Sequence, residues 1–252
     1  MIEIFILSII QGITEFLPVS SSSHLIIISK YLNFENQSLS IDVSLHIGSF
    51  IAVITYFRKD IVNFIKNKEL FFKIFLSSIP VMLTGFLLVK FELINQLRNL
   101  QVIGWTTIIF GILLYLSDKF SVENKIDNNF TIKSAIIIGV LQIFSLIPGV
   151  SRSGITITAA RILKFNRFDS AKISFFLSIP TLAAVSFFGF KNLYISNNLD
   201  FSALNLTSIF LSFVFSFITI KFFLNYIKNF NLNIFVIYRI VLGIFLLIIA
   251  YL

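Results

Sequence analysis

The chain has 252 residues, of which 57% are hydrophobic and only 13% are charged. A typical soluble domain is about 45–50% apolar and about 25% charged, so this chain has too few polar side chains to cover a surface that faces water. The composition excludes a soluble single domain, and it also excludes disorder, which requires low hydrophobicity. Long apolar blocks, rather than alternating strands of ~10 residues, exclude a membrane β-barrel. We expect an all-α polytopic membrane protein.

The formal net charge is +8, and the chain contains no cysteine. The absence of thiols excludes disulfides and thiolate metal sites. A positive charge indicates nucleic-acid binding only where basic residues gather on a soluble face. In membrane proteins the usual cause is an excess of Lys and Arg in cytoplasmic loops, so we expect no nucleic-acid partner.

The first apolar block, Ile2–Ile13, is too short to cross a membrane. At 1.5 Å per residue its 12 residues reach about 18 Å, roughly half of a bilayer. The block ends at Glu15, Pro18 and the serine run 20–23, and apolar residues resume at Leu25–Ser29. Short apolar arms around a polar centre are typical of a re-entrant hairpin, which must be buried in protein or line a watery cavity. The alternative is an ordinary span with a kink.

The middle of the chain contains three blocks that approach the ~20 apolar residues needed to cross a membrane. These predicted spans are Ile41–Phe57, Leu70–Val89 and Val102–Ser117. The polar stretch Asp118–Asn129 follows them and predicts a connection between two halves of the chain.

The second half repeats the pattern of a broken apolar block followed by spans. Ile132–Ile147 is interrupted by the polar segment 148–154 and resumes at Ile155–Leu163, which predicts a second re-entrant hairpin. Three further spans are predicted at Ser170–Phe188, Leu204–Tyr226 and Leu232–Leu252. The expected fold therefore has about six transmembrane helices and two re-entrant helical hairpins.

The two breaks also resemble each other in sequence. With one gap, Gln11-Gly-Ile-Thr-Glu-Phe-Leu-Pro-Val-Ser-Ser-Ser-Ser23 aligns with Gln142-Ile-Phe-Ser-Leu-Ile-Pro-Gly-Val-Ser-Arg-Ser153, and Phe75–Pro80 is echoed by Phe176–Pro180. We interpret residues 1–252 as one integral-membrane domain in which two repeats, roughly 1–100 and 130–252, have inverted topology. Such repeats commonly place a binding site near the membrane midplane.

The distribution of basic residues predicts the orientation. If the hairpins do not cross, both termini lie on one side of the membrane, and four basic residues fall on that side: Lys30, Lys90, Arg98 and Lys191. Fourteen fall on the other side: Arg58, Lys59, Lys66, Lys68, Lys73, Lys119, Lys125, Lys133, Arg161, Lys164, Arg167, Lys172, Lys221 and Lys228. Because cytoplasmic loops are enriched in Lys and Arg, we expect both termini outside. The N-terminus lacks the basic flank and cleavage site of a signal peptide.

Few ionisable residues lie inside the apolar blocks, and such residues are functional candidates by default. They are Glu15, His24, His46, Arg152 and Arg239. Hydroxyl side chains cluster beside them, at Ser20–Ser23 in the first break and at Ser151, Ser153, Thr156 and Thr158 in the second. If the two tips face each other, a carboxylate, an imidazole, a guanidinium and several hydroxyls share one polar pocket.

This combination of residues suits phosphoryl transfer, in which positioning and charge neutralisation supply most of the rate. Segment 148–154 has the features of an anion cradle: glycines that allow close approach, a helix N-terminus, and an arginine that grips phosphate. Ser21 or His24 could be the nucleophile, or His24 a general acid or base. Glu15 could orient the imidazole, act as a base, or hold a divalent cation.

Structural roles compete with these functions. His46 could be a hydrogen-bonded packing residue, and Arg152 could only balance Glu15 as a buried pair. Arg239 lies near a helix end, where we expect it to snorkel or to pair structurally. A flippase or secondary transporter is the alternative function, because inverted repeats with broken helices are typical of transporters. A transporter, however, needs no nucleophile, base and anion clamp together.

At these residues the chain resembles the undecaprenyl-diphosphate phosphatases, also called the bacitracin-resistance proteins. The signatures are Gln11-Gly-Ile-Thr-Glu-Phe-Leu-Pro-Val-Ser-Ser-Ser-Ser-His24 and Pro148-Gly-Val-Ser-Arg-Ser-Gly-Ile-Thr156, with further similarity at Leu45–Asp60 and Ile179–Ala184. The sequence departs from the family pattern at Gln11, where an acidic residue is common, and at Ser22-Ser23, where many members have Thr-Gly. Gln11 brings no charge, which weakens any model in which two carboxylates share a metal.

The resemblance implies hydrolysis of a C55 polyprenyl diphosphate to the monophosphate carrier of peptidoglycan synthesis, in the bacterial inner membrane. It also implies dependence on a divalent cation, Mg²⁺ or Ca²⁺, for which Glu15 is the expected ligand. The expected catalytic residues are Glu15, Ser21, His24 and Arg152, and the expected diphosphate-binding residues are Gln11, Ser20, Ser151, Ser153, Gly154 and Thr156. The expected partners are the lipid substrate and membrane lipid, and a homodimer is left open.

Overall fold

The computed structural model describes residues 1–32, 38–66, 68–91, 96–195 and 203–252. Apart from one isolated bridge, between Asn124 and Phe165, the regular elements of these residues are helices. They are α1 (Ile2–Thr14), α2 (Ser21–Leu32), α3 (Leu39–Tyr56), α4 (Arg58–Lys66), α5 (Lys68–Lys90), α6 (Leu100–Asp118), α7 (Ile126–Asn129), α8 (Ile132–Gln142), the 3-10 helix η2 (Ile143–Leu146), α9 (Arg152–Ile162), α10 (Arg167–Ile195), α11 (Ala203–Asn229) and α12 (Asn233–Tyr251).

Six helices of the described chain, α3, α5, α6, α10, α11 and α12, are long and apolar enough to cross a membrane. They correspond to the six predicted spans, so this prediction is confirmed. The largest difference is in α10, which starts at Arg167 and runs past the predicted end to Ile195.

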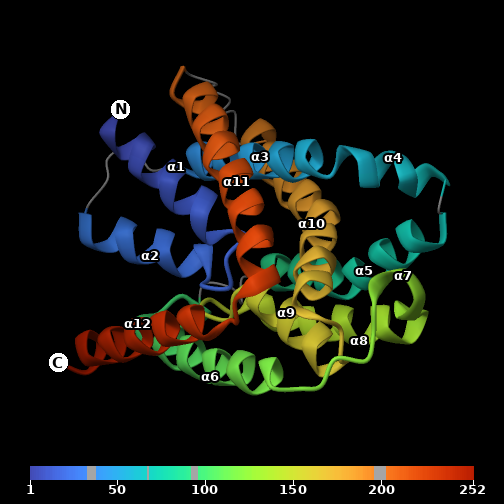
Figure 1. The fold of residues 1–252 in the computed structure, drawn as a ribbon. Coiled ribbons are helices and arrows are strands. Elements are labelled where there is room, and N and C mark those ends of the chain that lie inside the picture. Colours follow the sequence, from blue (N-terminus) through green and yellow to red (C-terminus); the bar gives the residue numbers. More distant parts are fainter. Residues whose placement is uncertain (33–37, 67, 92–95, 196–202) are drawn as a thin grey trace.

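The two broken blocks fold as helix–break–helix units. α1 runs toward the centre of the molecule and α2 returns toward the end that carries the N-terminus (Figure 1). α8 is continued by one turn of 3-10 helix, and α9 follows the break at Pro148 and Gly149. In both units the second helix begins earlier than predicted, at Ser21 and at Arg152, because Ser and Arg are compatible with a first helical turn even where the sequence is not apolar. The polar residues of each break therefore continue into the first turn of a helix.

A serine with a positive φ angle precedes each of these second helices. Ser20 has φ +75° and Ser151 has φ +70°, and Lys164 is the only other such non-glycine residue in the described ranges. Side chains other than glycine rarely adopt this conformation, so both breaks hold a strained turn at the same place relative to the helix that follows.

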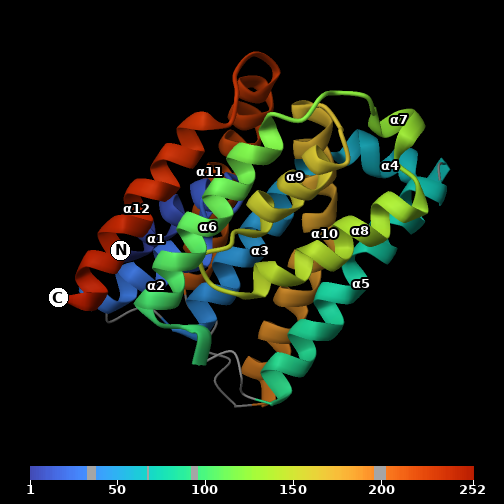
Figure 2. The same cartoon turned by 90° about the horizontal axis from the view of Figure 1, so that it is seen from below.

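The helices pack in pairs around the breaks. α3 and α1 pack against α11, α6 packs against α12, and α5 packs against α8, while α9 contacts α10, α6 and α8 (Figures 1 and 2). Phe16, in the first break, is fully buried and meets Phe175 of α10 edge to face, with ring centroids 5.4 Å apart. This aromatic contact anchors the tip of the first unit in the core.

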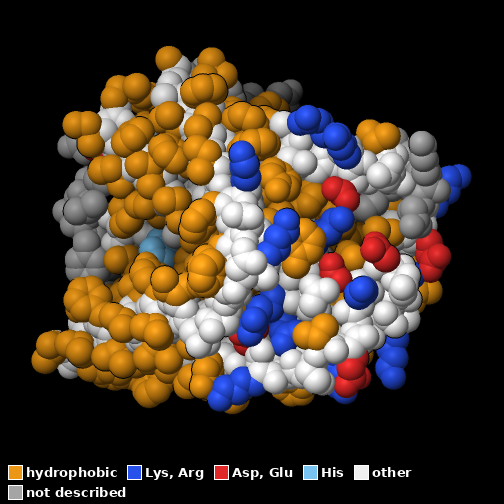
Figure 3. Space-filling view, viewed as in Figure 1, with side chains coloured by type: hydrophobic (Ala, Val, Ile, Leu, Met, Phe, Trp, Pro, Cys, Tyr) orange, Lys and Arg blue, Asp and Glu red, His pale blue; other side chains and the backbone are white. Residues whose placement is uncertain are grey.

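The surface is divided into a hydrophobic and a charged part. On the face shown in Figure 3, hydrophobic side chains cover α1, α11 and α12, and charged side chains gather toward the end that carries α4 and α7. Many large apolar side chains on the long helices are exposed, among them Phe210, Phe222 and Val241. Exposed apolar surface of this extent is unusual for a soluble monomer and is expected where lipid surrounds the helices. Both chain termini lie at the same end of the molecule, opposite α4 and α7 (Figures 1 and 2).

Candidate active site

The tips of the two breaks touch through side-chain hydrogen bonds. Nη2 of Arg152 lies 2.6 Å from Oε1 of Glu15, which makes a nearly buried ion pair across the two units. Beside it, the Ser153 hydroxyl donates to the Leu17 carbonyl at 2.7 Å. The tips of the two breaks therefore face each other and are in direct contact, and the use of residues 15–24 and 151–156 as one functional site stays a prediction.

Glu15 is the centre of this cluster. Its Oε2 accepts hydrogen bonds from the Ser21 hydroxyl at 2.7 Å and from Nε2 of Gln11 at 3.1 Å. Nε2 of Gln11 also lies 3.1 Å from Nδ1 of His46, so the amide joins a carboxylate and an imidazole. Glu15 is 8% exposed, and Phe16 beside it is fully buried. The carboxylate is thus fixed in place by three donors and by the packing of its neighbour.

The imidazole of His24 is oriented by groups other than Glu15. Its Nδ1 lies 2.7 Å from the carbonyl oxygen of Ser20, and its Nε2 lies 2.5 Å from the hydroxyl of Tyr238 on α12. The alternative in which Glu15 orients this ring is therefore wrong: Glu15 binds Ser21, Gln11 and Arg152 instead. Tyr238 was not among the predicted site residues, because a tyrosine within an apolar span gives no signal of its own.

Arg239, the next residue on α12, holds the two tips together. It is fully buried and donates to carbonyls of both breaks, to Gly149 from Nη2 at 2.9 Å and to Pro18 from Nη1 at 3.3 Å. Its Nε donates to the carbonyl of Thr107 on α6 at 3.2 Å. The expectation that Arg239 snorkels is wrong, and the expectation of a structural role agrees with these contacts. Within the described ranges no carboxylate lies in salt-bridge distance of it.

The predicted diphosphate-binding residues of the second break are only partly free. The hydroxyl of Ser151 caps α9 by accepting from the N–H of Gly154 at 3.1 Å, and it lies 3.1 Å from the Ser153 hydroxyl. Thr156 is fully buried, and its hydroxyl donates to Ser174 of α10 at 2.7 Å. Ser20 is bonded to Ser23 at 2.9 Å. Their part in substrate binding stays a prediction.

Buried polar atoms without a partner show where the site can still bind a ligand. They include Nη1 of Arg152 and Oε1 of Gln11. A carboxylate has about four acceptor positions, of which three on Glu15 are used, so one position remains, on Oε1, and the amide oxygen of Gln11 is also without a partner. Mg²⁺ is commonly held by one or two carboxylates together with substrate phosphates, and these oxygens fit that pattern. The described residues contain no group of three His, Cys, Asp or Glu that could hold a metal ion.

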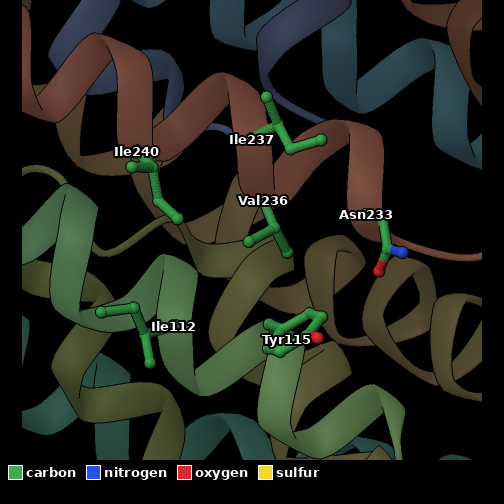
Figure 4. A pocket seen from close by; sticks show the side chains of 6 residues that line it. All are labelled: Ile112, Tyr115, Asn233, Val236, Ile237 and Ile240. Atoms are coloured by element: carbon green, nitrogen blue, oxygen red, sulfur yellow. The ribbon is translucent and has the colours of Figure 1, made fainter.

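An apolar cleft between α6 and α12 lies outside this site (Figure 4). It has a volume of about 240 Å³, and its lining residues are Ile112, Tyr115, Asn233, Val236, Ile237 and Ile240. The four α12 residues recur at helical spacing on one face of the helix, and Tyr238 falls on the opposite side. The cleft and Tyr238, the partner of His24, therefore lie on opposite faces of α12.

The fold and the site define a multi-pass helical membrane protein with a buried acid–base cluster between two broken helical units. The chain matches the family model of the bacitracin resistance protein BacA over residues 4–245, and it belongs to this family. Sequence relatives agree over almost the whole length of the chain.

An undecaprenyl-diphosphatase of Pelagibacter ubique strain HTCC1062 is 52% identical over 251 residues, covering 99% of this chain and 98% of the relative. Undecaprenyl-diphosphatases of Saccharophagus degradans and of Jannaschia sp. strain CCS1 are 41% and 36% identical, and cover 94% and 98% of this chain and 93% and 98% of their own lengths. The family recognised from the two signature segments is therefore confirmed.

Proposed function

We propose that this chain is an integral-membrane phosphatase that hydrolyses undecaprenyl diphosphate to undecaprenyl phosphate and inorganic phosphate. The observation that carries the proposal is the contact between Glu15 and Arg152, which joins the two signature segments in one site. Three relatives that are 36–52% identical bear the name of this activity. The product would return to peptidoglycan synthesis as the lipid carrier.

We place the chain in the bacterial inner membrane, with the two broken units as re-entrant hairpins of an inverted repeat and with both termini outside. Support comes from the antiparallel course of α1 and α2 and from the common end at which both termini lie (Figure 1). The positive φ angles of Ser20 and Ser151 at equivalent points of the two units also support the repeat. The buried site then lies where the hairpin tips meet inside the membrane, which is the usual position in such repeats.

In the first chemical step the Ser21 hydroxyl attacks the terminal phosphorus. Ser21 already donates its hydrogen bond to Oε2 of Glu15, so the carboxylate is placed to take the proton as the O–P bond forms. Arg152 uses Nη2 for Glu15 and has Nη1 free for a phosphate oxygen. The P–O bond to the bridging oxygen breaks, and undecaprenyl phosphate leaves with the bond's electron pair.

In the second step water hydrolyses the phosphoserine. Nε2 of His24 takes one proton of the attacking water, and Glu15 returns its proton to the Ser21 oxygen as inorganic phosphate leaves. Glu15 and Gln11 would hold the divalent cation, which supplies charge neutralisation of the phosphate oxygens when bound. Ser21 and His24 lie three residues apart on α2, so both are on the same face of the helix.

Phosphate release from a polyprenyl diphosphate by the purified protein in detergent tests the proposal. We expect release by the wild type and a loss of at least about 100-fold in His24→Ala and Arg152→Ala, with Lys133→Ala, an exposed change on α8, as the control. No release by the wild type, or equal rates in all variants, would indicate a binding or transport role instead. A phosphoenzyme trapped by rapid quenching should survive acid and be absent in Ser21→Ala; an acid-labile adduct would make His24 the nucleophile.

A further inference from the structure

The hydrogen bonds of His24 determine which of its nitrogens carries the proton. A carbonyl oxygen can only accept, so the contact between Nδ1 and the Ser20 carbonyl at 2.7 Å requires a proton on Nδ1. The neutral ring then has its lone pair on Nε2. Because Nε2 must accept, the Tyr238 hydroxyl is the donor in the 2.5 Å contact between them. The ring has no free nitrogen while this contact exists.

Tyr238 is held in this position by the residue that follows it. Arg239 is fully buried and bonded to carbonyls of both breaks and of α6, which fixes this turn of α12 relative to the hairpin tips. The rings of His24 and Tyr238 are almost parallel, at 10°, with centroids 5.7 Å apart. The phenol itself is 44% exposed, so the contact depends on the fixed position of this turn of α12 and on the alignment of the two rings rather than on burial.

We propose that Tyr238 is a positioning residue of the phosphatase site. Its hydroxyl donates a hydrogen bond to Nε2 of His24 and so keeps this nitrogen unprotonated, until a substrate phosphate oxygen replaces Nε2 as the acceptor. The inference rests on the proposed function, because it concerns the nitrogen that accepts the proton of the attacking water. It adds a residue of the last helix to a site that is otherwise built from the two signature segments.

The exchange of hydrogen bonds follows from the single proton of the phenol. One hydroxyl proton serves one acceptor at a time, and a negatively charged phosphate oxygen is a stronger acceptor than a neutral imidazole. When a phosphate oxygen arrives, Tyr238 donates to it and Nε2 becomes free, while the phenol keeps its proton and no covalent bond changes. The same hydroxyl thus holds the base in its active tautomer before the reaction and contacts the phosphate during it.

The other charged groups near His24 have partners of their own. α2 packs against α1, and its residues Ile26 and Ile27 also meet α6 and α12. Glu15, after the end of α1, is bonded to Arg152, Ser21 and Gln11, and Arg239 is bonded to backbone carbonyls. At the ring itself the two contacts that remain are the Ser20 carbonyl and Tyr238.

Nitrogen-15 NMR of histidine-labelled protein in detergent tests this inference directly. The chain has only two histidines, His24 and His46, so a His46→Gln variant assigns both signals. We expect wild-type His24 to be protonated on Nδ1 and not on Nε2 at neutral pH. In Tyr238→Phe the titration midpoint of His24 should rise by about half to one pH unit, the equivalent of one ordinary hydrogen bond to the neutral ring.

Tyr115→Phe is the matched control, because Tyr115 lines the cleft between α6 and α12 on the other side of α12 (Figure 4). The titration midpoint of His24 in Tyr115→Phe should equal that in the wild type. In kinetics, the step that uses His24 is the hydrolysis of the phosphoserine, so the acid limb of kcat for this step should shift by the same amount in Tyr238→Phe, and its rate below neutral pH should fall about three- to tenfold.

Two results would overturn the inference: a wild-type His24 that carries its proton on Nε2, or a Tyr238→Phe midpoint equal to that of the wild type. A fall in thermal stability and activity without a shifted midpoint would show a merely structural tyrosine and would also overturn it. The NMR measurement needs no turnover, so its failure is distinguishable from a failure of the proposed activity, which appears as absent phosphate release.

Discussion

Arg239 is a fully buried charged residue, and its hydrogen-bonding partners are backbone carbonyls. Placing a guanidinium in an apolar interior is costly unless its donors are used, and here they bind Gly149, Pro18 and Thr107. Two of these carbonyls belong to the two breaks and the third to α6. A single side chain thus joins three segments that are distant in the sequence, among them the two breaks whose tips meet at Glu15 and Arg152.

Replacing Arg239 by methionine should destabilise the protein and reduce its activity. Each carbonyl that stays buried without a donor costs about 1–3 kcal/mol, and Gly149 retains only a long contact with Thr107. We expect a loss of about 2 kcal/mol or more, a lower melting temperature in detergent, and at least tenfold slower phosphate release well below that temperature. Arg239→Lys, which keeps one donor group, should fall between.

Arg58→Met is the control for this experiment, because Arg58 is exposed and its contact with the Thr55 carbonyl is long, at 3.4 Å. Its melting temperature should match that of the wild type. Equal stability of Arg239→Met and Arg58→Met would mean that the carbonyls find other donors and that Arg239 does not join the tips.

The residues of the site differ in how well the sequence reveals them. Glu15, His24 and Arg152 stand out because ionisable side chains are rare in apolar blocks, and the structure brings all three to the hairpin tips. Tyr238 does not stand out, because tyrosine is common in membrane helices and its hydroxyl partner is 214 residues away in the chain. Arg239 is visible as a charge, but its partners are carbonyls, which no side-chain pattern can indicate.

At the scale of elements, the breaks depend on close backbone contacts. Gly149 has φ +95°, and a Cβ atom there would clash with the Thr106 hydroxyl and lie 2.7 Å from the Ile103 carbonyl oxygen. The Thr106 hydroxyl also donates to the Pro148 carbonyl at 2.6 Å, so α6 holds the second tip. Only glycine combines this backbone angle with this approach of α6.

Gly149→Ala should therefore displace the second tip from α6. Strain at a positive φ costs about 1–3 kcal/mol, and the clash with backbone atoms adds to it. We expect a loss of at least about 2 kcal/mol of stability and a strong loss of phosphate release, measured by thermal unfolding and by activity.

Gly85→Ala in α5 is the matched control. A Cβ at Gly85 would lie 3.4 Å from a methyl carbon of Leu146, which is ordinary contact, and alanine favours a helix. Its stability should stay the same or rise. If Gly149→Ala behaved like Gly85→Ala, the tip would be flexible enough to move without loss, and the close approach of α6 would not hold it in place.

The lengths of the helices were predictable from apolar runs, whereas their arrangement was less so. The sequence similarity between Phe75–Pro80 and Phe176–Pro180 was expected to mark equivalent helices of the two halves, but Pro80 lies in α5 and Pro180 in α10. These helices hold different places in the order after the two breaks, so this echo lends the repeat no support. The packing gives better support. α1 of the first half packs on α11 of the second half, and α8 of the second half packs on α5 of the first, which is the reciprocal pattern expected of two related halves. Such pairing depends on contacts between helices far apart in sequence.

At the scale of the whole molecule, the charges are distributed along one axis. Charged side chains gather toward the end with α4 and α7, away from both termini (Figures 1 and 3). Within this end, buried Asp118 accepts from Arg167 at 2.7 and 3.0 Å and lies 3.5 Å from Arg161, which ties α6 to α9 and α10. An end rich in Lys and Arg is expected to face the cytoplasm.

Cysteine accessibility can test this orientation cleanly, because the chain has no cysteine of its own. We expect Leu252→Cys, at the exposed C-terminus, to react in intact spheroplasts with a thiol reagent that does not cross membranes. Lys125→Cys, in the exposed connection after α6, should react only after the membrane is opened. The positive-inside rule is statistical, so the two sites must be compared in the same preparation. The reverse labelling pattern would show the opposite orientation, with the Lys- and Arg-rich end outside. Labelling of both sites in intact cells would mean that the hairpins and the six long helices do not cross the membrane in the proposed way.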